Sequence, residues 1–186
     1  MNKEALSIPR VGQIRLSSGA SIIAESLENY GNPGAVEDHE ARHAVAALVG
    51  GTHVYEASGK PRPGSLGHVT LGSPDPAAAA APDAFGCPGT GHDMWTVRSQ
   101  GVSESSAREA GKARLSGMER HVRAVAHLIS EEGIVSGAKI EQRMKEVDEG
   151  EKTLIRMFDQ NGKEIIRLEK RIKGETVMIP GTIFEL

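Results

Sequence analysis

The 186-residue sequence is poor in aromatic side chains and in cysteine. One Trp, two Tyr and three Phe leave the core to be built from Leu, Ile, Val, Ala and Met. The single cysteine, Cys87, excludes an intramolecular disulfide and a cysteine-rich zinc site. A formal net charge of −3 argues against general nucleic-acid binding, which needs a concentrated basic surface.

Long apolar runs are also missing. No stretch approaches the ~20 apolar residues that span a bilayer, and residues 1–6 lack the apolar core of a signal peptide. We therefore expect a soluble, cytoplasmic protein with no membrane partner, formed by one domain with room for a small appendage.

The most informative stretch covers residues 36–49, which contain the pattern His-Glu-x-x-His in a segment that is predicted to be helical. His39 and His43 are four residues apart, so a helix presents both imidazoles on one face to a single metal ion. Glu40 follows the first histidine, where it can accept a proton from a metal-activated water. The pattern also arises by chance, but here Ala, Val and Leu follow at helical spacing and Gly50 ends the helix. This stretch predicts a Zn²⁺ site with Glu40 as general base.

Two strand-like segments follow the metal helix, at residues 52–57 and 66–72, and predict a β-hairpin beside it. Its outer edge could bind an extended peptide by strand addition. The predicted substrate-binding residues on this edge are Gly67, His68, Val69 and Thr70.

The next segment is a run of alanines at residues 77–81 that prolines bracket closely. At most a turn or two of helix is expected here. It is interpreted either as a flexible connector or as a rim over the active site. Further helices are predicted at about 93–100, from 103 or 105 to about 132, and at 137–147.

The two ends of the chain have β-hairpin patterns. Segments 11–16 and 20–24 form the first hairpin, and segments 153–158 and 163–168, joined by Asn-Gly, form the second. Residues 176–179 and 182–184 could add strands. The ends could pair into one sheet or form an interface to another subunit. The predicted division is a ribbon at 1–34, a peptidase-like domain at 35–148 and a β appendage at 149–186.

A catalytic zinc site needs a third protein ligand. Spacing alone does not rank the remaining candidates, although His121 and His127 are better explained as helix-surface or packing residues and His53 and His68 as structural ones. The candidates are His53, His68, His92, Asp93, His121, His127 and further carboxylates.

Four segments, in order, resemble the peptidase domain of the FtsH-type zinc metalloproteases. Residues 39–44 resemble that family's His-Glu-Ala-Gly-His-Ala, and residues 66–74 are similar to its Leu-Gly strand. Residues 89–94 resemble the segment that contains its third zinc ligand, and 119–137 resemble its late helices. Of the four segments, only the metal motif is specific by itself. The matching order of all four segments strengthens the resemblance.

The resemblance implies that His39, His43 and Asp93 bind zinc, with Glu40 as general base. It implies an α+β, mainly α, zincin-like peptidase domain with a small β-hairpin beside the metal helix and a β-rich terminal appendage. It further implies proteolysis of a protein or peptide substrate, and it leaves room for a homo-oligomer because family members work as rings.

Three departures from the family stand out. Arg42 replaces a glycine and adds charge near the cleft, and the stretch before Asp93 is much shorter than in the family. No Gly-x-x-x-x-Gly-Lys-Ser/Thr loop is present, so we expect ATP-independent cleavage of flexible or unfolded segments. Two other functions stay open: a catalytically inactive zinc-binding or regulatory protein that keeps the peptidase fold, and a metal-dependent hydrolase with a non-peptide substrate.

Overall fold

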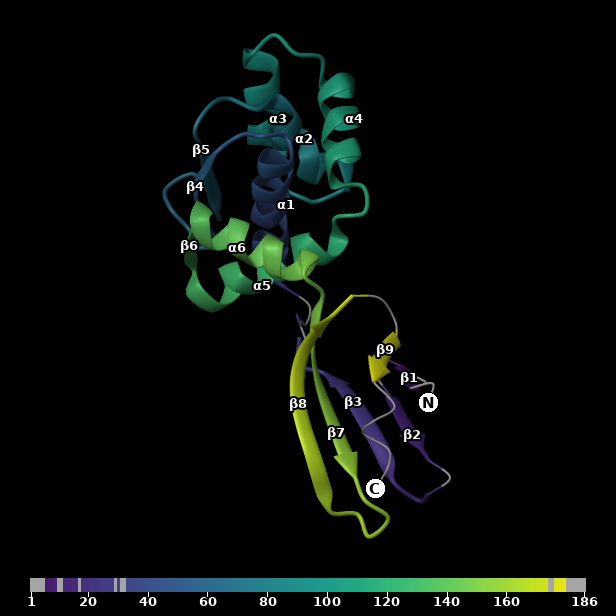
Figure 1. Ribbon diagram of the computed structural model, residues 1–186. Coiled ribbons are helices and arrows are strands. Elements are labelled where there is room, and N and C mark those ends of the chain that lie inside the picture. The colour runs from purple at the N-terminus through teal and green to yellow at the C-terminus, as the bar shows by residue number, and fades with distance from the viewer. Residues whose placement is uncertain are drawn as a thin grey trace. The chain divides into compact units, whose positions relative to one another are not determined.

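The computed structural model describes residues 6–9, 12–16, 18–28, 30, 33–173 and 176–179. The chain divides into two compact units, one formed by residues 30–147 and the other by both chain ends, residues 1–29 and 148–186. Both helices and antiparallel sheets are present, so the α+β class is confirmed (Figure 1). Among the described residues, no helix has the length and apolar character needed to cross a membrane.

The unit of residues 30–147 is mainly helical and holds a three-stranded antiparallel sheet of order β5-β4-β6. Its elements are α1 (Ala35–Val49), β4 (Val54–Ser58), β5 (His68–Leu71), α2 (Pro76–Ala84), α3 (Gly91–Ser99), α4 (Glu104–Leu115), α5 (Glu119–Glu132), β6 (Ile134–Ser136) and α6 (Gly137–Asp148). The predicted hairpin after the metal helix is confirmed as β4 and β5, in which Ala57 pairs with Val69. β6 adds a third strand on the other side of β4, which leaves β5 as an edge.

Helix α1 lies in the middle of this unit (Figure 1). Its alanine-rich face is fully buried against α2, α5 and the sheet, since small side chains let the neighbouring elements approach closely. The core is aliphatic, as the composition predicts; its larger members are Val45, Val54, Leu115, Val122, Val125, Leu128, Ile129, Val135 and Ile140.

Helix α2 corrects the interpretation of the alanine run as a flexible connector. Residues 76–84 form a helix that packs against α1 and α4. Pro76 occupies the first turn, where a proline costs no hydrogen bond, and the Asp75 side chain caps the helix by accepting from the Ala78 N–H. On α4, Gly111 has no side chain and so allows this contact: a Cβ there would lie 2.6 Å from the Ala77 carbonyl oxygen.

The prediction of one helix from Ser103 to about Glu132 was wrong. The chain forms α4 and α5 with a break at Ser116–Met118, because Gly117 has a positive φ of 77° that ends the first helix. Of the two predicted starts, Ser103 and Ser105, the structure uses Ser103, whose hydroxyl accepts from the Ser106 N–H. The predicted helices at 93–100 and 137–147 are present as α3 and α6.

The other unit is built from both chain ends, which is the first of the two arrangements that the sequence left open. β2 (Gly12–Arg15) and β3 (Ser21–Ser26) form one hairpin, and β7 (Glu151–Phe158) and β8 (Glu164–Ile172) form the other. β3 pairs with β7, so the sheet has the order β2-β3-β7-β8. β1 (Leu6–Pro9) pairs with β9 (Thr176–Ile179), and the predicted strand at 182–184 lies outside the described residues.

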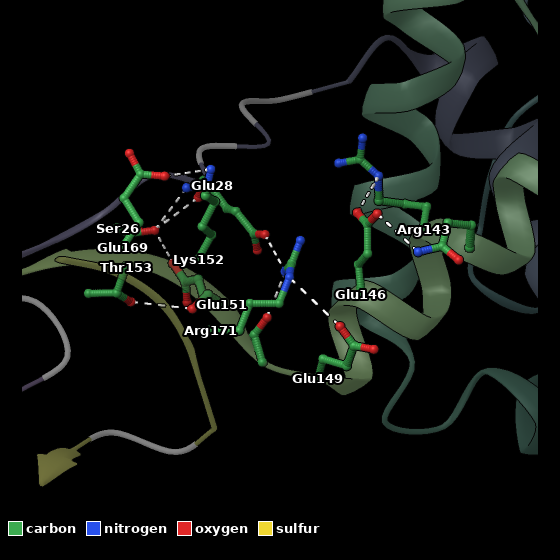
Figure 2. A network of polar contacts seen from close by, with 12 residues as sticks. Ser26, Glu28, Arg143, Glu146, Glu149, Glu151, Lys152, Thr153, Glu169 and Arg171 are labelled. Atoms are coloured by element: carbon green, nitrogen blue, oxygen red, sulfur yellow. Dashed lines mark hydrogen bonds and ion pairs between the residues drawn. The ribbon is translucent and has the colours of Figure 1, made fainter.

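Polar contacts join the segments through which the chain leaves and re-enters this sheet (Figure 2). The Arg171 guanidinium donates to Glu28 Oε1 at 2.7 Å and to the Gly150 carbonyl oxygen at 2.9 Å. Nearby, the Ser26 hydroxyl donates to the Glu151 carboxylate. These contacts hold the end of β3 beside the start of β7, although the two segments are far apart in sequence.

Candidate metal centre

Three side chains that could bind a metal meet between helices α1 and α3. His39 and His43 lie one turn apart on α1, and Asp93 lies in the first turn of α3. His39 Nε2 is 3.1 Å from both Asp93 Oδ2 and His43 Nε2, and His43 Nε2 is 3.5 Å from Asp93 Oδ2. Within the part of the chain that the structure describes, no other group of three or more such side chains gathers in this way.

These distances fit a zinc ion. Zinc holds nitrogen and oxygen ligands at about 2.0–2.1 Å, so two neighbouring ligands of a tetrahedron lie roughly 3.3–3.4 Å apart. The three measured separations, 3.1, 3.1 and 3.5 Å, bracket that value. Two imidazoles and one carboxylate are also a ligand set of catalytic zinc sites, in which the fourth position stays open.

The charges at the cluster favour a cation. Burial opposes ionisation of Asp93, but hydrogen bonds from His39 and His43 hold the pKa of its carboxyl far below the usual range. Burial likewise opposes charge on His43, yet Asp93 raises the pKa of this imidazole above its usual value. A metal ion bound at this cluster would therefore compete with a proton for the same position and release it.

The His43 ring is fixed from its other side. His43 Nδ1 lies 2.8 Å from the Ala78 carbonyl oxygen of α2, which can only accept, so Nδ1 carries the proton. In the neutral imidazole this leaves the Nε2 lone pair directed at His39 and Asp93. A metal-binding histidine needs this arrangement.

Glu40 is buried beside the cluster, with 6% of its surface exposed. Burial raises the pKa of its carboxyl, while His43 and His39 oppose the shift. Gly67, just before β5, leaves room for the Glu40 side chain. A Cβ on Gly67 would lie 2.7 Å from Glu40 Oε1 and 2.8 Å from Glu40 Cγ.

We expect Gly67→Ala to destabilise the protein because the added methyl group overlaps Glu40 and the Ser58 carbonyl oxygen, which would lie 2.7 Å from it. Overpacking of this kind costs about 1–3 kcal/mol in the free energy of unfolding. Chemical denaturation measures the loss. Gly72→Ala is the matched control, because its Cβ would lie 3.2 Å from His53 Cβ, a looser contact. Equal losses in the free energy of unfolding of the two variants would contradict the tight packing of Gly67 against Glu40.

The other predicted substrate-binding residues alternate along the edge strand β5. Val69 packs against the core, Thr70 is exposed, and His68 Nε2 lies 3.1 Å from Glu56 Oε1. Gly67 lies directly against Glu40, and His68 is near enough to oppose the burial that raises the pKa of the Glu40 carboxyl. Two of the four predicted residues therefore adjoin the candidate site.

The remaining histidines do not join the cluster of described residues. His53 contacts the Tyr55 ring, His92 stacks on Trp95, and His127 lies 3.3 Å from Glu131. His121 is buried in α5. These placements agree with structural or surface roles.

Arg42 does not leave an unpaired charge near the site. Its guanidinium binds Asp38 at 2.9 Å and Glu119 at 3.3 Å, and it lies over the Phe85 ring at 4.8 Å. The half-buried Cys87 lies 3.7 Å from Asp38 and packs in the same place. Arg42 thus ties α1 to α5 and to the end of α2.

A scan against protein-family models, a search of curated proteins and a search of solved structures each found no match. The relation to FtsH-type metalloproteases therefore stays a prediction, supported by motif order and by the geometry of the cluster.

Sequence reasoning missed the Ala78 carbonyl that orients His43. The signal was present in Pro82, four residues after Ala78, because a proline inside a helix leaves one carbonyl without its usual donor.

Proposed function

We propose that this chain is a zinc-dependent endopeptidase of the FtsH type that cleaves flexible or unfolded polypeptide segments without ATP. One observation carries the proposal: His39, His43 and Asp93 lie at tetrahedral spacing with Glu40 buried beside them. This combination supplies a metal-binding set and a carboxylate base in one place.

Zinc, when bound by these three residues, supplies a Lewis acid that polarises a carbonyl and acidifies water. Glu40 accepts a proton from the attacking water and passes it to the departing amine nitrogen. Its buried position suits both steps, since a carboxyl with a raised pKa retains a proton long enough to return it. Asp93 contributes negative charge to the metal, and the Ala78 carbonyl keeps His43 oriented.

The substrate is proposed to be an extended peptide that pairs with the free edge of β5. Strand addition binds through main-chain hydrogen bonds and accepts many sequences. Gly67 adjoins both this edge and Glu40, so a peptide added there passes the base. Only a locally unfolded segment can extend in this way, which is why the proposed substrates are flexible.

The test is metal analysis followed by a cleavage assay. We expect about one zinc ion per chain, because the three proposed ligands form a single site. Hydrolysis of casein or a flexible peptide should stop with a chelator and return with added zinc. Absence of metal would refute the proposal. Metal without hydrolysis of any peptide would instead favour the inactive binding protein.

A further inference from the structure

Ala78 of α2 uses both of its main-chain polar groups outside the regular helix ladder. Its N–H donates to Asp75 Oδ1 at 3.0 Å, and its carbonyl oxygen accepts from His43 Nδ1 at 2.8 Å. The residue is fully buried, so no water competes for either group. Ala78 therefore links Asp75, which caps α2, to His43, a proposed metal ligand.

Pro82 removes the helix donor that the Ala78 carbonyl would otherwise have. In an α-helix, the N–H of residue 82 would donate to the carbonyl of residue 78. Proline has no N–H, and its ring pushes the carbonyl four residues earlier away from the helix axis. An unpaired buried carbonyl is costly, and His43 provides its donor.

The other end of this peptide segment is held by a partly buried ion pair between Asp75 and Arg114. The Asp75 carboxylate accepts from Arg114 Nη1 at 2.7–2.8 Å and from Thr52 Oγ1 at 2.7 Å. Arg114 Nη1 also donates to the Ala46 carbonyl oxygen of α1 at 3.3 Å. The start of α2 is thus fixed to the helix that carries His43.

We propose that Pro82 is a positioning residue of the metal centre: it frees the Ala78 carbonyl, which fixes the tautomer and ring orientation of His43. The effect on metal affinity rests on the proposed metal-binding function; the effect on the tautomer does not. A proline inside a helix is otherwise unfavourable, and positioning His43 explains its presence in α2.

The test compares Pro82→Ala with Pro76→Ala, a matched control in the first turn of the same helix, where no ladder donor is restored. Pro82→Ala restores an N–H that takes one lone pair of the Ala78 carbonyl and draws its oxygen back toward the helix axis, which weakens its hydrogen bond from His43. We expect its zinc affinity, measured by competition with a chromogenic chelator, to fall by about 10-fold, the lower end for loss of an outer-shell partner. Pro76→Ala should stay within about threefold of wild type.

Stability separates this role from a merely structural one. Removing a helix-interior proline should leave the midpoint of thermal unfolding of the metal-free chain unchanged or higher, so a weaker zinc site cannot reflect a weaker fold. Equal zinc affinity in Pro82→Ala and wild type would overturn the inference.

A second measurement does not depend on metal. Nitrogen-15 NMR of the metal-free full chain, at a pH where His43 is neutral, should show the proton on Nδ1 in wild type, and a smaller Nδ1–H fraction in Pro82→Ala. A proton on Nε2 in wild type would overturn the inference, even if the protein binds zinc. If wild type binds no zinc but shows the expected tautomers, the proposed function fails and the positioning role stands.

Discussion

The Glu40→Gln variant is expected to retain zinc and to lose peptide hydrolysis by a factor of about 10² to 10⁴, the usual contribution of a positioned acid–base group. Glutamine has nearly the same shape, so the packing against Gly67 is kept. It cannot accept a proton from water, so the reaction loses its base. The measurement is kcat for a flexible peptide, with the zinc content of both proteins determined in parallel.

Glu37→Gln is the matched control. It makes the same chemical change in the first turn of the same helix, and Glu37 is outside the His39, His43 and Asp93 cluster. Its kcat should stay close to that of wild type. Equal hydrolysis by Glu40→Gln and wild type would rule out Glu40 as the base. Loss of zinc in Glu40→Gln would show a structural role instead.

Local patterns predicted the elements that carry the site. The spacing of His39 and His43 placed both on one face of α1, and the alternating segments after it formed the β4–β5 hairpin. The two terminal hairpins were equally visible, since alternation and turn residues act within a few positions. Each of these features depends on residues that are close in sequence.

The errors came from forces that act between distant segments. The alanine run has prolines on both sides, yet burial against α1 and α4 stabilises it as helix α2. The long helical stretch is an exception, because its break is local: the positive φ of Gly117 ends α4, which the apolar periodicity alone did not predict. The pairing of β3 with β7 joins opposite ends of the chain, and spacing could not choose it over a subunit contact.

The proposed third ligand, Asp93, shows the same limit. Residue types left several histidines and carboxylates as candidates, and only the family resemblance selected Asp93. The structure brings Asp93 to His39 and His43 because α2 and the loop after it return the chain to the face of α1. Such a closure depends on packing along the whole segment, which no short motif encodes.

Asp93→Ala is therefore expected to weaken zinc binding by more than the ~10- to 100-fold that loss of an outer-shell partner costs. The variant removes one of three ligands and the only negative charge among them. Two neutral imidazoles remain, fewer than the three protein ligands that a catalytic zinc site uses. Competition with a chelator of known affinity measures the change, and circular dichroism checks that the helices persist.

The neighbouring His92 provides the sharpest control, because it was an equal candidate for the third ligand by residue type. In the structure His92 is exposed and stacks on Trp95, at 5.9 Å between ring centres, and it is absent from the cluster. His92→Ala should leave zinc affinity nearly unchanged. The opposite pattern, with zinc lost in His92→Ala and kept in Asp93→Ala, would require α3 to be rotated about its axis. Loss in neither variant would place the third ligand elsewhere, and the tetrahedral spacing at Asp93 would then be only a hydrogen-bonded contact between three side chains.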